Sequence, residues 1–274
     1  MATYAPSIQK LLPTDIDSTT TIRKLTSNIT IVNIPFQIGG TVKAGGRTTI
    51  CRMHSGRLAV FSPTPLIQSV ETAVAEMGGN VSHLIAPNKG HHLFLGQWKT
   101  RYPNAKIIGP IGLPEKRAKS EEVDQVGFDT VIGEELDEES DSEFAIEFLN
   151  TYPNSDIVFD FIREKTLIEG DVWFNVPALE QYSSSNEDPK SGLPTKLVTH
   201  INQAPGDSWT GRMKWFVFTG GNQESLARSV KAIQEWPFER IVPCHGDVLE
   251  NDAKAKWKSL FPRHYIQNAE LARD

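Results

Sequence analysis

The sequence has 274 residues, of which 39% are hydrophobic and 23% are charged, so it is long and apolar enough to bury a substantial core. Its net charge of −6 gives no electrostatic reason to expect nucleic acid or an anionic membrane as a partner. No apolar run approaches the ~20 residues that span a bilayer, no secretory signal is visible, and the two cysteines favour a reduced, cytoplasmic protein.

The first half of the chain predicts several strands and then an alternation of helix and strand. β-Branched residues mark the early strands, and apolar residues from Ile67 to Met77 recur at helical spacing. The expected elements are an irregular N-terminal arm over residues 1–27, strands over 29–36, 47–53, 57–61, 81–86 and 105–110, and helices over 67–77 and 91–102. This order is typical of a layered α/β domain.

The second half of the chain begins with a polar stretch over residues 112–142. The carboxylates that crowd residues 134–143 are typical of a solvated loop rather than a binding site. A flexible segment over 181–195 belongs to an insertion over 176–220 near the expected site. Further elements are expected as strands over 144–149, 157–162, 166–169 and 240–243, and as helices over 223–236 and 251–260. With no internal repeat and no second boundary, residues 1–274 are expected to form a single domain.

Three strand ends carry residue types that bind metals. His91 and His92 follow the strand and loop that begin at Leu84, Asp171 ends a strand after a glycine, and His245 follows a short buried strand. Taken singly, each has an ordinary explanation as a helix cap, a core residue or a turn. Ligands nevertheless gather at strand ends in layered α/β proteins, so the three together indicate a metal site.

Two of these segments resemble motifs of the metallo-β-lactamase superfamily. Its hydrophobic-x-Gly-Asp-x-x-Phe motif is matched by Ile168-Glu169-Gly170-Asp171-Val172-Trp173-Phe174. Its Val-Pro-Gly-His-Gly motif is similar to Ile241-Val242-Pro243-Cys244-His245-Gly246. The resemblance covers roughly residues 29–260 and points to a divergent branch. It implies an α/β fold that is a four-layer αββα sandwich, with two mixed β-sheets flanked by helices.

The chain departs from the superfamily at its His-x-His-x-Asp-His loop. When His92 is aligned with the last histidine of that loop, Pro87 and Lys89 replace the first two histidines. In the same alignment His91 replaces the aspartate. The superfamily's lone middle histidine is expected near residues 151–156, where the chain has none. The resemblance therefore implies that the ligands of one metal are lost and those of the other survive.

The surviving ligands suit a single metal ion. Imidazoles and a carboxylate are typical of zinc, and non-haem iron is the alternative. An open coordination position would allow a metal-activated water to act as the nucleophile, whereas four tetrahedral protein ligands would close the site. The implied ligand set is His91, His92, Asp171 and His245.

The resemblance implies a metal-dependent hydrolase of a small-molecule acyl bond, such as an ester, thioester or lactone. Asp171 would also be catalytic, and the Lys89 ammonium would stabilise an oxyanion. Candidate substrate-binding residues are Trp173, Trp209 and Trp215, of which the last two equally suit the core. Two alternatives stay open: a non-catalytic scaffold that has lost its dinuclear centre, and a mononuclear iron redox enzyme.

Overall fold

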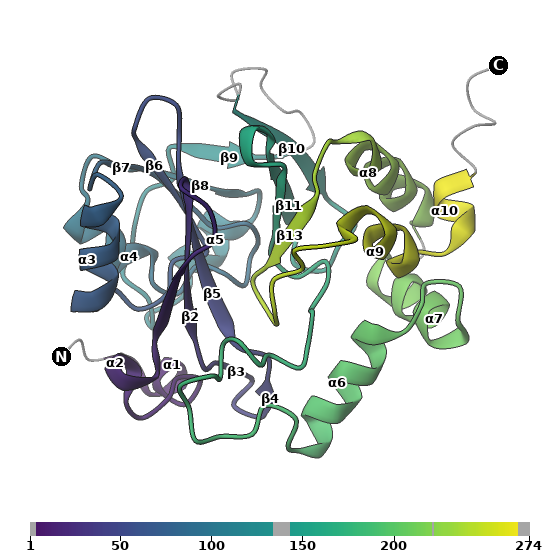
Figure 1. Cartoon of the computed structure of the whole chain (residues 1–274), viewed down its shortest axis with the longest axis horizontal. Helices are drawn as coiled ribbons and strands as arrows, with labels where there is room; N and C mark the ends of the chain where they lie inside the picture. The colour runs from purple at the N-terminus through teal and green to yellow at the C-terminus, as the bar shows by residue number, and fades with distance from the viewer. Residues whose placement is uncertain (1–3, 134–142, 221, 268–274) are drawn as a thin grey trace.

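Two β-sheets lie side by side in the middle of the molecule (Figure 1), in a computed structural model that describes residues 4–133, 143–220 and 222–267. The larger sheet has the order β1-β2-β5-β6-β7-β8-β9. Pairing is antiparallel from β1 to β6 and parallel from β6 to β9. Its strands are β1 (Thr21–Lys24), β2 (Ile29–Ile34), β5 (Gly46–Arg52), β6 (Leu58–Phe61), β7 (Val81–Ile85), β8 (Lys106–Pro110) and β9 (Thr130–Ile132).

The smaller sheet has the order β10-β11-β12-β13 and is also mixed. β10, β11 and β12 pair antiparallel, whereas β12 and β13 run parallel although some seventy residues separate them in the sequence. The strands are β10 (Phe144–Leu149), β11 (Asp156–Phe161), β12 (Thr166–Glu169) and β13 (Arg240–Pro243), and a separate hairpin pairs β3 (Gln37–Ile38) with β4 (Val42–Lys43). The parallel pair brings the ends of two distant segments to one edge.

The helices lie outside the two sheets (Figure 1). In the described part of the chain, none of them has the length and apolar character that crossing a membrane requires. They are α1 (Pro6–Gln9), α2 (Ile16–Thr19), α3 (Gln68–Glu76), α4 (Leu95–Arg101), α5 (Leu113–Ala118), α6 (Leu193–Gln203), α7 (Trp209–Phe218), α8 (Gln223–Glu235), α9 (Ala253–Leu260) and α10 (Arg263–Gln267), with a 3-10 turn η1 (Ile162–Glu164).

Three hydrophobic clusters separate four layers. The first packs the larger sheet against α3 and α4, and it includes Val60 of β6 and Val74 of α3. The second joins the two sheets, where the rings of Phe61 and Phe159 lie 5.0 Å apart between centroids. The third packs the smaller sheet against α8 and α9, around the fully buried Trp257. Alternate residues of each central strand face opposite clusters, which produces the expected αββα order.

Several segments differ from the expected elements. The helix predicted from residue 91 begins only at Leu95, so the two adjacent histidines lie in turns before it. The arm over residues 1–27 is not irregular throughout, because it contains α1, α2 and the edge strand β1. The polar stretch over 112–142 contains α5 and β9, although residues 134–142 of the expected acidic loop lie outside the described residues. The insertion over 176–220 holds α6 and α7.

Asp160 on β11 is a buried carboxylate with no hydrogen-bond partner among the described residues. Burial raises its pKa from the ordinary 3.8 to about 6, against the opposing charge of Lys254. The folded state therefore holds this proton more tightly than the unfolded chain does. The contribution of Asp160 to stability is greatest at low pH and falls as the pH rises through about 6.

We expect the unfolding free energy of Asp160→Asn, minus that of the parent chain, to be about 1–2 kcal/mol larger at about pH 8 than at about pH 5. Urea unfolding of both proteins at the two pH values measures this change. A difference in unfolding free energy that is the same at both pH values would come from local packing alone. That result would contradict the raised pKa of Asp160.

Candidate metal centre

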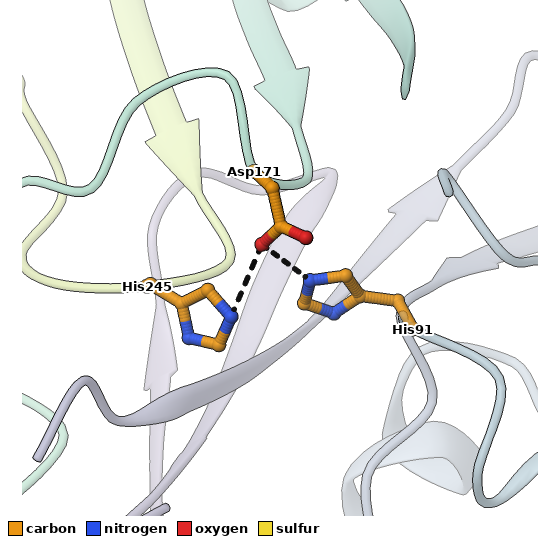
Figure 2. A group of neighbouring side chains, drawn as sticks. All are labelled: His91, Asp171 and His245. Atoms are coloured by element: carbon orange, nitrogen blue, oxygen red, sulfur yellow. Dashed lines mark hydrogen bonds and ion pairs between the residues drawn. The ribbon is translucent and has the colours of Figure 1, made fainter. Parts of the chain in front are cut away.

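Three side chains from distant segments converge at one edge of the sheets (Figure 2). Asp171 follows the end of β12, His245 follows the parallel strand β13, and His91 follows β7 in the larger sheet. Asp171 Oδ1 lies 3.1 Å from His91 Nε2 and 3.3 Å from His245 Nε2. Their ligand atoms all lie within 4.8 Å of one another, so the three form a candidate metal site.

The backbone fixes the ring of His245 in one tautomer. Its Nδ1 lies 2.6 Å from the carbonyl oxygen of Gly45, and a carbonyl only accepts, so Nδ1 carries the hydrogen. In the neutral ring Nε2 then carries the lone pair that a metal would take, whereas in the protonated ring Nε2–H donates to Asp171 Oδ1. A histidine held in this way by a backbone carbonyl is typical of metal ligands.

Two asparagine amides hold the other carboxylate oxygen of Asp171. Asn88 Nδ2 and Asn154 Nδ2 donate to Asp171 Oδ2 at 2.9 Å and 2.7 Å. Asn88 also donates to Asp156 Oδ1, and its own Oδ1 accepts from the backbone N–H groups of Gly90 and His91. Only Oδ1 of Asp171 is therefore left facing the two imidazoles.

Asn88 and Asn154 were not expected as site residues from the sequence, although two features of the sequence bear on them. Asn88 lies between Pro87 and Lys89, inside the degenerate histidine loop. Asn154 lies within residues 151–156, where the superfamily's middle histidine was expected. An amide side chain between the two lost histidine positions, and another where the middle histidine was expected, are the signal that would have found them.

Gly170 keeps the space that this arrangement needs. A Cβ at this position would lie 2.5 Å from Asn88 Nδ2 and 2.6 Å from Asp156 Oδ1. Either contact is closer than a real Cβ tolerates, so the amide and the carboxylate reach Asp171 only because residue 170 has no side chain.

The buried charges of the cluster support one another. Burial alone would raise the pKa of Asp171, but the charge of His91 and the hydrogen bonds from His245 and His91 outweigh it and hold that pKa well below its usual range. Burial would likewise lower the pKa of His91, yet Cys244 and Asp171 raise it well above its ordinary value. Burial and the charge of Asp171 raise the pKa of Asp156 to about 7. A metal would have to displace the proton from His91.

His92 is not part of the cluster, and its expected role as a fourth ligand is corrected here. Arg117 donates to His92 Nδ1 at 3.0 Å and to the His92 carbonyl at 2.5 Å. Burial and the charge of Arg117 lower the pKa of His92 to about 3, so the ring is neutral and its hydrogen sits on Nε2. Neither ring nitrogen has a free lone pair for a metal.

The structure also places Lys89 and the tryptophans away from the site. The Lys89 side chain lies beside Gly112, and it is Lys116 on α5 whose side chain lines the cavity described below. Trp173 and Trp215 are buried in the cluster behind the smaller sheet, and Trp209 is 77% exposed. None of the three tryptophans is among the described residues that line the cavity, and Trp215 is fully buried, in keeping with the core alternative.

The three converging side chains lie at a cavity of about 510 Å³, a volume typical of small-molecule sites. Its walls come from both halves of the chain and are mostly apolar. The insertion contributes Val198 of α6 and Phe218 of α7. The principal apolar wall residues are Phe36, Val42, Phe94, Phe174, Val198 and Phe218.

Comparison with known proteins relates the chain to solved structures only. No family model matches the sequence, and no curated protein sequence does. A metallo-β-lactamase from Pontibacter korlensis is 12% identical with a TM-score of 0.54, covering 88% of this chain and 98% of that one. The metallo-β-lactamase FIM-1 from Pseudomonas aeruginosa in its mono-zinc form is 10% identical with a TM-score of 0.52, covering 95% and 98%. The Flv1 flavodiiron core from Synechocystis is 13% identical with a TM-score of 0.53, covering 88% and 61%. At these identities the likeness establishes the fold.

Proposed function

On the premise that this chain has the metallo-β-lactamase fold, we propose that it is a mononuclear zinc hydrolase of a small-molecule acyl bond, such as an ester, thioester or lactone. One observation carries the proposal. His91 Nε2, His245 Nε2 and Asp171 Oδ1 converge beside a cavity large enough for a small molecule. Two imidazoles and a carboxylate make a three-ligand set, which in proteins is the pattern of a catalytic zinc with an open position.

The donor set fits one metal rather than two. In the superfamily the carboxylate at this position bridges two ions. Here the amides of Asn88 and Asn154 donate to Asp171 Oδ2, so that oxygen has no lone-pair direction left open toward a second cation. The other oxygen faces His91 and His245, which are the remaining nitrogen donors.

The chain's own groups would position the reactants. Bound zinc polarises a carbonyl and brings the pKa of its water close to ~7. Asp171 would hold the zinc through Oδ1, since both amides donate to Oδ2, and the same carboxylate would help to orient the water. Lys116, which lines the cavity, takes the electrostatic role first expected of Lys89. Its ammonium is close enough to Asp171 for the two charges to interact.

Metal analysis and hydrolysis together test the proposal. Protein purified without added metal is expected to contain about one zinc per chain and to hydrolyse p-nitrophenyl esters, with both properties lost in Asp171→Ala. Iron in place of zinc would support the redox alternative. A chain that binds neither metal would support the non-catalytic scaffold. Either result would overturn the proposed hydrolase function.

A further inference from the structure

Apolar side chains from several elements make up most of the cavity walls. Phe36 and Val42 come from the region of the β3–β4 hairpin, and Phe94 comes from the turn before α4. Phe174 lies in the loop that follows β12, three residues after Asp171, and Val198 lies on α6 in the insertion. Because burying hydrocarbon against such walls is the main favourable term available, the cavity selects an apolar ligand.

The polar groups in the walls already have partners inside the protein. Ser62 Oγ lies 2.8 Å from Cys244 Sγ, and Thr64 lies at the same distance from Thr48. The guanidinium of Arg47 donates to Asn33 Oδ1, to the carbonyls of Pro243 and Gly246, and to Glu180 Oε2. A sugar, nucleotide or peptide would bring many polar groups that these walls leave without partners.

Charged groups are confined to the end of the cavity that holds the metal candidates. Asp171 is the only carboxylate among the described lining residues, and besides the engaged Arg47 the only lysine or arginine is Lys116. A substrate is therefore expected to present one polar function at this end and hydrocarbon elsewhere. An aliphatic acyl compound has these two parts, because its carbonyl is the polar function and its tail is hydrocarbon.

We propose that the substrate is an aliphatic acyl ester, thioester or lactone whose hydrocarbon tail lies between Val42, Phe174 and Val198. The proposal rests on the proposed hydrolase function and adds the substrate class. Its carbonyl faces Asp171, and its tail fills the apolar part of the cavity.

Chain-length dependence is the first measurement. For the zinc-loaded protein, kcat/KM is expected to rise at least about tenfold from p-nitrophenyl acetate to p-nitrophenyl octanoate, because each buried methylene adds to binding. Val198→Asp places a carboxylate in the wall and is expected to remove this rise, so that the ratio of kcat/KM for the octanoate to kcat/KM for the acetate falls to about one or below. Leu197→Asp is the matched control and is expected to keep the rise. Leu197 is the neighbour of Val198 on α6, is 60% exposed and does not line the cavity. Equal rates on both esters would overturn the substrate class.

Binding without turnover separates this proposal from the proposed function. Calorimetry of the chain with octanoate and with acetate is expected to detect octanoate only, with affinity lost in Val198→Asp and kept in Leu197→Asp. If no ester is hydrolysed but octanoate binds in this way, the hydrolase fails while the acyl site stands. If acetate and octanoate esters are cleaved alike and octanoate does not bind, the acyl site fails while the hydrolase stands.

Discussion

Replacing His91 by alanine is expected to raise the dissociation constant for zinc at least about 100-fold, because the loss of a direct ligand costs no less than the loss of an outer-shell partner. His91 Nε2 points at the shared position beside Asp171 Oδ1. His245→Ala is expected to have the same effect, since its Nε2 lies on the other side of that oxygen. Competition with a chromophoric chelator measures both constants.

The neighbouring histidine supplies the control. His92 accepts a hydrogen bond from Arg117 and does not face the cluster, so His92→Ala should leave the zinc affinity within about threefold of the parent. If truncation destabilises the fold by leaving Arg117 without its partner, His92→Asn keeps an acceptor near that guanidinium. Zinc loss in both His92 variants, with the fold intact by circular dichroism, would show that the wrong histidine has been assigned.

Gly246→Ala is expected to destabilise the chain by roughly 3–4 kcal/mol, one of the larger losses from a single methyl group. Gly246 has φ +88, and a Cβ there would overlap the backbone carbonyl of Asn175. Its N–H also donates to Gln181 Oε1 at 2.8 Å, so the segment has little freedom to move away. Because Gly246 follows His245 directly, the same strain should weaken zinc binding.

A second glycine isolates the cause. Gly56 also has a positive φ, +78, but a Cβ there would meet no atom within 4 Å. Gly56→Ala should therefore cost only the backbone term of about 1–2 kcal/mol. Urea unfolding of the two variants gives the difference, and a loss at Gly246 no greater than that at Gly56 would mean that the steric overlap is relieved without cost.

Sequence reasoning succeeded where the signal is local. Alternating apolar residues predicted the central strands, and a strand that ends in Gly170 and Asp171 predicted a carboxylate at a sheet edge. The order of these segments carried the resemblance, and the two sheets with outer helices confirm the expected αββα fold. The sequence did not place the rings of Trp173 and Trp215, because a run of large apolar residues does not tell whether the rings face a cavity or a core.

The hydrogen bonds from two asparagine amides to Asp171 could not be predicted from the sequence. Asn88, Asn154 and Asp171 are 66 and 17 residues apart along the chain, and nothing in any one segment shows that the others will meet it. Their contact exists because the loop after β7 and the loop before β11 both reach the end of β12. Only the folded chain therefore decided that one carboxylate oxygen of Asp171 accepts from the two amides and the other faces the two imidazoles.

By itself, the amino-acid sequence indicated a layered α/β domain and the strand ends at which its metal-binding residue types lie, because both depend on patterns within short segments. The four-layer αββα order was implied by the resemblance of two motifs to a known superfamily. Tertiary structure alone decided which of two adjacent histidines faces Asp171. Consecutive side chains leave the backbone in different directions, and here the Asn88 side chain holds the loop while Arg117 draws His92 to the other side. The choice between His91 and His92 thus depends on partners that lie 3 and 25 residues away, in contacts formed only on folding.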